Sequence, residues 1–311
     1  MMKLLALLCL LLSGCANLQR AEAPIHRWTD VHLFGVTAIA FSGDGRLLAS
    51  GGHRGEIAIW DIATRARLAA TAGLGEPVRA IEWSDATLIS ADRNGLARWR
   101  AADLTPIGKR PTSPVAGLAS SRGTLYSAHS DGIVRAWNAD LKPLGEQQAA
   151  AELIAIAAHG ERIAVAADDG QVRVYDRQLK HVIDMENRGS AAHDLRFSAD
   201  GKALLGGGWF RLLVWNADSG RATSVAAEHN GLLTSLDTSR DNRWIATVGR
   251  HTDSAIRVWQ RDGYQIARRL AAHDLCGAMI RFSPDGRYLA SASDDESIAL
   301  FDLATPPPAA R

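Results

Sequence analysis

The chain has 311 residues, of which 47% are hydrophobic, 22% charged and 6% aromatic, and its formal net charge is +1. This composition excludes a disordered chain, and the balanced charge excludes electrostatic attraction to nucleic acid. Three cysteines, at positions 9, 15 and 276, cannot form a disulfide framework, and no metal-binding motif is present, so we expect no metal and no cofactor.

The chain begins with the pattern of a secretory leader. One basic residue, Lys3, precedes an apolar run from Leu4 to Leu12. Nine residues span about 13 Å as a helix, well short of the roughly 30 Å hydrocarbon core of a bilayer. The run therefore predicts a cleaved signal peptide rather than a membrane span.

The tetrapeptide Leu12-Ser13-Gly14-Cys15 resembles the lipobox of bacterial lipoproteins. The resemblance implies cleavage before Cys15, acylation of that residue, palmitate included, and a lasting membrane anchor. Ala16 suggests sorting to the outer membrane, facing the periplasm, where the envelope has two membranes. The alternative is an ordinary cysteine in a leader that is uncleaved or conventionally cleaved. The expected division is a signal peptide at 1–14, a lipidated cysteine and tether at 15–23, a folded domain at 24–303 and a proline-rich tail at 304–311.

A strand-like segment ending in an aromatic residue recurs seven times, at separations of 39, 38, 38, 40, 44 and 42 residues. Within each copy apolar residues alternate with polar ones, and turns such as Ser42-Gly43-Asp44-Gly45 separate the runs. This pattern predicts short antiparallel strands joined by tight turns, with almost no helix. The seven aromatic residues are Trp60, Trp99, Trp137, Tyr175, Trp215, Trp259 and Phe301.

These copies resemble the WD40-repeat family. The best-preserved copy runs from His273 to Asp302, and the Trp-Asp dipeptide that names the family stands intact at Trp60-Asp61. The resemblance implies an all-β, seven-bladed β-propeller of four-stranded antiparallel blades. Only LATPPPAAR follows the last copy, so its outer strand must come from elsewhere. We expect the segment Ile25–Val31 to close the ring by pairing with the last blade.

In this family a histidine, a serine or threonine, an aspartate and a tryptophan form a buried hydrogen-bonded network in each blade. Copies two to four have no histidine ahead of the first strand, and in the first copy Arg54 stands in the place of the aspartate, so we expect that network to be broken. A hydrolase triad would need a nucleophile motif such as G-x-S-x-G, which is missing, so we expect no enzyme. The predicted network members are His229, Thr247, Asp253 and Trp259 in the sixth copy and His273, Ser291 and Asp295 in the seventh.

The stretch GGGWFRLLVW, Gly206–Trp215, departs from the other copies. Its sisters carry a polar turn such as HSDG where this copy has three glycines followed by Trp209 and Phe210. Two alternatives follow: Trp209 folds inwards and fills space, or it points outwards as an anchor for a partner.

The resemblance implies that loops on one rim of the propeller bind proteins. We therefore expect a lipid-anchored, extracytoplasmic interaction scaffold of the bacterial envelope, with envelope proteins as partners and no nucleic acid. The alternative is a propeller enzyme or small-ligand binder that uses the mouth of the central channel. That alternative needs convergent polar side chains, and the sequence shows only dispersed ones. The candidate partner-binding residues are Trp209, Phe210, Arg54, His53, Arg93, Asn230 and Leu232.

Overall fold

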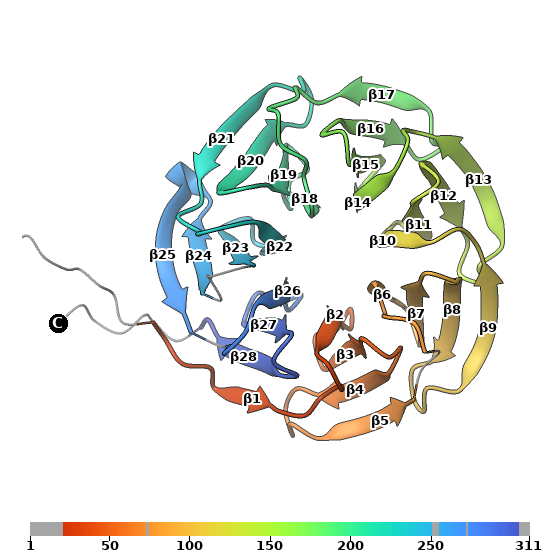
Figure 1. Cartoon of the computed structure of the whole chain (residues 1–311), viewed down its shortest axis with the longest axis vertical. Coiled ribbons are helices and arrows are strands. Elements are labelled where there is room, and N and C mark those ends of the chain that lie inside the picture. The colour runs from red at the N-terminus through yellow and green to blue at the C-terminus, as the bar shows by residue number, and fades with distance from the viewer. Residues whose placement is uncertain (1–20, 73–74, 251–254, 272, 305–311) are drawn as a thin grey trace, which may run out of the picture.

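Seven four-stranded antiparallel sheets stand around a central axis as the blades of a propeller (Figure 1). The computed structural model describes residues 21–72, 75–250, 255–271 and 273–304. Among these residues the one helical element is a 3-10 turn, η1 (Asp262–Tyr264), and no helix is long and apolar enough to cross a bilayer. The predicted seven-bladed fold is confirmed.

Blades 1 to 4 each use four consecutive strands, in order from the axis outwards. Blade 1 comprises β2 (Val36–Phe41), β3 (Leu47–Gly52), β4 (Ile57–Asp61) and β5 (Arg67–Thr71). Blade 2 comprises β6 (Ala80–Ser84), β7 (Thr87–Asp92), β8 (Gly95–Arg100) and β9 (Pro106–Pro111). Blade 3 comprises β10 (Val115–Ser121), β11 (Thr124–His129), β12 (Ile133–Trp137) and β13 (Pro143–Gln148). Blade 4 comprises β14 (Leu153–His159), β15 (Arg162–Ala167), β16 (Val172–Asp176) and β17 (His181–Asp184).

Blades 5 and 6 follow the same rule, and blade 7 does not, because its outermost strand is the first strand of the chain. Blade 5 comprises β18 (Leu195–Phe197), β19 (Ala203–Gly207), β20 (Arg211–Asn216) and β21 (Ala222–Ala226). Blade 6 comprises β22 (Leu233–Thr238), β23 (Trp244–Gly249), β24 (Ile256–Gln260) and β25 (Gln265–Leu270). Blade 7 comprises β26 (Gly277–Phe282), β27 (Tyr288–Ser293), β28 (Ile298–Asp302) and β1 (His26–Trp28).

The ring closes as predicted, by antiparallel pairing of β1 with β28. Arg27 pairs with Ala299, and Trp28 pairs with Ile298. Trp28 is buried, and its indole Nε1 donates a 2.9 Å hydrogen bond to the carbonyl of Arg65 in blade 1. The first described strand thus joins blade 7 to blade 1.

The folded domain extends two residues further towards the N-terminus than the predicted boundary at 24. Glu22 N donates to Arg269 O (2.8 Å), and Ala271 N donates to Glu22 O (2.9 Å), on the outer strand of blade 6. The carboxylate of Glu22 also forms an ion pair with Arg268. Glu22 is therefore bonded to blade 6, although the sequence suggested that it belongs to the tether.

Apolar side chains at alternate strand positions pack between neighbouring blades. Between blades 7 and 1 the rings of Trp28 and Trp60 lie 5.6 Å apart, in one cluster with Ile298 and Leu300. Burial of one such large side chain contributes about 1.5–3 kcal/mol. The repeated aromatics all lie buried on the third strand of their blades: Trp60, Trp99, Trp137, Tyr175, Trp215, Trp259 and Phe301.

Serine and aspartate define the turn between the first two strands of several blades. Ser42 Oγ donates to Asp44 Oδ1 (2.6 Å) and accepts a hydrogen bond from Leu47 N (3.0 Å). Gly45 adopts a left-handed φ of 72°, which glycine tolerates without strain. The same Ser-to-Asp bond recurs from Ser198, Ser239 and Ser283.

Candidate functional site

Blade 7 contains a buried polar network around His273, in the loop before β26. His273 Nε2 is hydrogen-bonded to Ser291 Oγ (2.9 Å), and its Nδ1 lies 3.4 Å from Asp295 Oδ2. Burial alone would raise the pKa of Asp295, but hydrogen bonds from His273 and Ser297 hold it well below its usual range. Arg27 of β1 also contacts Asp295 (2.8 Å), so the network and the ring closure share one carboxylate.

Blade 6 holds the second predicted network. His229 Nε2 lies 3.0 Å from Thr247 Oγ1, which also accepts a 2.9 Å hydrogen bond from Trp259 Nε1. Arg257 Nη1 donates to His229 Nδ1 (2.7 Å). The predicted acid, Asp253, lies outside the described residues. Thr247 on β23 therefore hydrogen-bonds both the imidazole of His229, in the loop before β22, and the indole of Trp259 on β24.

Blade 1 forms the same link although Arg54 occupies the place of the acid. His32 Nε2 lies 2.8 Å from Ser50 Oγ, which accepts a 2.9 Å hydrogen bond from Trp60 Nε1. The network predicted to be broken is thus intact between histidine, serine and tryptophan. Burial lowers the pKa of His32 to about 4, against the opposing charge of Glu56, so the ring is neutral at pH 7.

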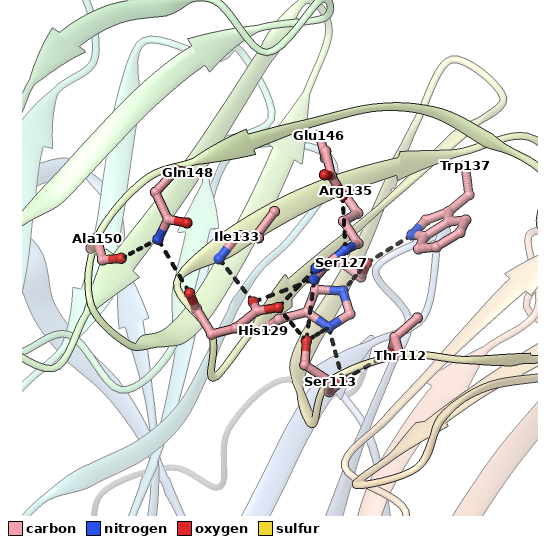
Figure 2. Close-up of polar contacts among 11 residues, drawn as sticks. Thr112, Ser113, Ser127, His129, Ile133, Arg135, Trp137, Glu146, Gln148 and Ala150 are labelled. Carbon is pink, nitrogen blue, oxygen red and sulfur yellow. Dashed lines mark hydrogen bonds and ion pairs between the residues drawn. The ribbon is translucent and has the colours of Figure 1, made fainter.

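Blade 3 makes these hydrogen bonds with a histidine that the sequence pattern did not identify. His129 ends β11, two residues after Ser127, and its Nε2 lies 2.7 Å from Ser127 Oγ (Figure 2). Trp137 Nε1 donates to the same hydroxyl (2.8 Å). Alternate residues of a strand face the same side, which brings the ring to the hydroxyl from within the strand. The available signal was a Ser-x-His pattern in the second strand.

An acid joins the blade 3 network through Ser113. The Ser113 carbonyl lies 3.0 Å from His129 Nδ1, and the Ser113 hydroxyl donates to Asp131 Oδ2 (2.6 Å). Arg135 contacts Asp131 (2.8 Å) and Glu146 (3.2 Å), as Figure 2 shows. Burial would raise the pKa of Asp131, but hydrogen bonds from Arg135 and Ser113 lower it to about 2.

These serine, histidine and aspartate groups form hydrogen-bonded networks inside the blades. Ser127 and His129 are fully buried, and Ser291 is likewise inaccessible, so no substrate carbonyl reaches a hydroxyl. No three His, Cys, Asp or Glu side chains of the described residues are grouped as ligands for a metal ion. The networks instead hydrogen-bond the second strand of a blade to its third strand and to the preceding loop.

Trp209 and Phe210 point outwards from the turn between β19 and β20. Their side chains are 46% and 55% exposed, and their ring centroids lie 5.9 Å apart. Phe210 N donates to Gly231 O (2.9 Å), and Trp209 forms a β-bridge with Leu232. Exposed Asn230 directly precedes Gly231 and Leu232 in the loop before β22. Four of the predicted rim residues therefore lie together at the junction of blades 5 and 6.

Close packing explains the three glycines before Trp209. A Cβ atom on Gly206 would lie 2.9 Å from the ring of Trp215, and one on Gly207 would lie 2.8 Å from the carbonyl of Leu233. A Cβ on Gly208 would meet a serine hydroxyl at 2.8 Å. The backbone of the turn thus packs against the blade, which leaves the two aromatic side chains on the outside.

The other predicted rim residues lie on different blades. His53 and Arg54 are in the β3–β4 turn of blade 1, and Arg93 is in the β7–β8 turn of blade 2. These turns share one face with the loops before the inner strands, because neighbouring strands are antiparallel. Sequence reasoning missed the exposed Phe34 and Leu275 on this face, although both stand in loops before an inner strand.

Comparisons with known proteins agree with the repeat pattern. The profile "WD domain, G-beta repeat" matches residues 24–61, 222–260 and 266–302. Protein hir1 of Emericella nidulans is 25% identical over 179 residues, which cover 48% of this chain and 17% of hir1. Nuclear distribution protein nudF of Aspergillus niger is 27% identical over 161 residues, or 44% of this chain and 36% of nudF. The matches thus span only a small part of these relatives.

A chain in the crystal structure of a mitotic checkpoint complex has the same fold. Its TM-score is 0.79 at 21% identity, and the alignment covers 93% of this chain and 98% of that chain. Each profile match begins at an outer strand and ends at a third-strand aromatic or just after it, so the sequence repeat is offset by one strand from the blade. The match at 24–61 therefore includes β1, which completes blade 7. Three segments of the chain thus match the WD40 repeat, and the described residues form a seven-bladed β-propeller.

Proposed function

We propose that this chain is a non-catalytic scaffold that docks a partner protein on the rim centred on Trp209 and Phe210. The observation that carries the proposal is a pair of neighbouring aromatic side chains, about half exposed, on a backbone turn fixed by hydrogen bonds. Aromatic anchors of this kind dominate the free energy of many interfaces, because they bury a large area at a small entropic cost.

Three further apolar side chains lie exposed on the same face and would extend the contact. They are Leu33 (45% exposed), Phe34 (65%) and Leu275 (55%), in the loops before blades 1 and 7. Apolar rim residues clustered on four adjacent blades differ from single exposed residues on outer strands, which are ordinary on any protein surface. The solved chain with the same fold belongs to a mitotic checkpoint complex, which also supports a role in protein assembly.

The proposal includes a lipid anchor on Cys15 that holds the scaffold, outside the cytoplasm, to the bacterial envelope, on the outer membrane where two membranes exist. Its support is the leader pattern with its lipobox-like end. Seven residue steps separate Cys15 from Glu22, which is bonded to blade 6, and they span at most about 25 Å. The anchor would therefore keep the edge of the propeller close to the membrane surface, where its envelope partners are confined.

Crosslinking followed by affinity capture and mass spectrometry tests the rim. The test variant is Trp209→Ala with Phe210→Asn, since asparagine tolerates the left-handed φ of 59° at position 210. We expect it to lose at least tenfold in captured partner. The matched control, Leu144→Ala with Val182→Ala, removes two equally exposed apolar side chains from outer strands and should capture normally.

Two outcomes would overturn the proposal. Capture of the same partners in the same yield by a folded rim variant would exclude the rim as the docking surface. Palmitate labelling and membrane fractionation test the anchor. The wild-type protein should take up the label and fractionate with membranes, whereas Cys15→Ser should do neither. Absence of label on the wild type would exclude the lipid anchor while leaving the rim untouched.

A further inference from the structure

Residues from the inner strands of all seven blades line a cavity of about 520 Å³. These strands stand around the axis of the ring (Figure 1). Ala199 and Pro284, in loops that follow inner strands, are part of its lining. Because inner strands begin at the Trp209 rim, these loops lie at the opposite face, and the cavity is reached from there. A cavity of this volume accommodates a small organic molecule.

One equivalent position on every inner strand lines this cavity. In blades 1, 3 and 4 it is occupied by alanine: Ala40, Ala119 and Ala157. In the other blades it is charged: Glu82 in blade 2, Arg196 in blade 5, Asp237 in blade 6 and Arg281 in blade 7. Blades 5 to 7 are neighbours, so three of the four charged positions lie side by side, and Glu82 of blade 2 lies between the alanines of blades 1 and 3.

The carboxylates of blades 5 and 6 are occupied by hydrogen bonds from the protein. Asp194, just before β18, accepts bonds from two backbone N–H groups (3.0 Å each) and from Ser235 Oγ (2.8 Å). Asp237 Oδ2 accepts a 2.7 Å bond from the N–H of Phe282. These acids have little capacity left for a cationic ligand.

The guanidinium groups of Arg196 and Arg281, which line the cavity, keep donors that form no hydrogen bond with the described residues. Arg281 uses Nη1 for Ser235 Oγ (3.0 Å) and Ile280 O (2.6 Å), and its Nε and Nη2 meet no hydrogen-bond acceptor among the described residues. Arg196 uses Nη1 for Asp194 (3.0 Å) and Leu195 O (2.7 Å) and Nε for Asp237 (3.3 Å), and the described residues offer no acceptor to its Nη2. Donors of this kind fit the oxygens of a carboxylate.

Three arginines and three carboxylates lie in or beside the cavity. Ser120 donates a 3.1 Å hydrogen bond to Glu82, and burial raises the pKa of Glu82 against the opposing charges of Arg196 and Arg281. His159, which also lines the cavity, adds no negative charge. The remaining charged groups are Arg196, Arg240 and Arg281 against Asp194 and Asp237.

We propose that the central channel binds a small monocarboxylate with an apolar body, whose oxygens accept hydrogen bonds from Arg196 and Arg281. Phe41, Phe197 and Phe282 line the same cavity and supply apolar contacts for that body. This site goes beyond the scaffold function. It lies on the other face from Trp209 and shares no residue with the rim, so either proposal can fail without the other.

Ligand-observed NMR titration of the purified folded chain tests the site, with benzoate as the probe. Benzamide has the same shape without the charge, and inorganic phosphate has charge without the apolar body. We expect benzoate to bind at least tenfold more tightly than either. Arg281→Gln should weaken benzoate binding at least tenfold, whereas Arg287→Gln, which removes an exposed ion pair with Asp302 outside the channel, should not.

A second variant keeps the test decisive if Arg281→Gln destabilises the protein. Ala40→Leu narrows the channel from blade 1, which packs beside blade 7, and it keeps every charged group, so it should also weaken benzoate binding at least tenfold. The proposal is overturned if wild-type protein binds no benzoate, if benzamide or phosphate binds as tightly, or if folded Ala40→Leu protein binds benzoate as the wild type does.

Discussion

Blade 3 and blade 7 each place an imidazole against a buried serine, but they draw that imidazole from different parts of the chain. In blade 7 the imidazole of His273 comes from the loop before the inner strand. In blade 3 His129 comes from the second strand itself, two residues from Ser127. The two blades thus share the position of the imidazole beside the serine hydroxyl, whereas the position of the histidine in the sequence differs.

The two blades also differ in how many chain segments complete them. Blade 3 is built from consecutive strands, and its acid, Asp131, is held by Arg135 of the same blade. Blade 7 is completed by β1, and its acid, Asp295, is held by Arg27 from that strand. A local defect in blade 3 therefore stays local, whereas loss of β1 opens the ring and removes a partner from the network of blade 7.

Deletion of residues 21–28 is the change with the largest expected effect. It removes the outer strand of blade 7, the buried Trp28 and the ion pair of Arg27 with Asp295. Loss of a buried tryptophan side chain alone costs about 3–5 kcal/mol, against a typical total of 5–15 kcal/mol. We expect a truncated chain that shows no cooperative unfolding transition by circular dichroism.

A synthetic peptide of residues 21–31, added to the truncated chain, is the control. If ring closure is the cause, the peptide should restore the transition in a concentration-dependent way. A truncated chain that unfolds at the wild-type temperature without peptide would show that the closure carries little stability.

Removal of the imidazole compares the two networks directly. His129→Ala and His273→Ala each leave a buried serine with one partner fewer and create a void, so each should cost about 3 kcal/mol in the free energy of unfolding. Urea denaturation measures both. A cost below about 0.5 kcal/mol for His129→Ala, beside a full cost for His273→Ala, would show that the histidine within the strand is no equivalent of the histidine in the loop.

The architecture could be predicted from the sequence because its determinants recur at regular intervals. Seven third-strand aromatics at nearly constant spacing and the strand at Ile25–Val31 sufficed for the blade number and the ring closure. The predicted start of the folded domain, residue 24, lies two residues after Glu22. Contacts to Arg268 and Arg269, more than 240 residues away, hold Glu22 on blade 6. Such long-range pairing leaves no local signal.

The candidate sites were harder to predict for the same reason. Arg196, Asp237 and Arg281 are about forty residues apart and look dispersed, yet the propeller brings them to one wall of the channel. The direction of Trp209 depended on how closely Gly207 packs against Leu233, which no spacing of residues reveals. Only the positions fixed by the repeat, such as His273, could be placed in advance.

The pH dependence of stability separates the network of blade 1, where Arg54 replaces the aspartate, from the network of blade 7, where Asp295 is present. The pKa of His32 is about 4 in the folded state and about 6.5 in an unfolded chain. Between these values the unfolded state binds a proton that the folded state does not, so stability falls as the pH falls. From pH 7 to pH 5 this one residue should cost about 2 kcal/mol, a loss that is completed near pH 4.

His32→Gln isolates this contribution when unfolding free energies of variant and wild type are measured by urea denaturation at both pH values. Glutamine has no group that titrates in this range, so the wild type should lose about 2 kcal/mol more than the variant between pH 7 and pH 5. Ser50→Ala is the matched control, because it destabilises the same network while it keeps the imidazole in place. Equal losses in wild type and His32→Gln would mean that His32 takes up its proton over the same pH range in the folded and unfolded chains, and that burial in blade 1 does not lower its pKa.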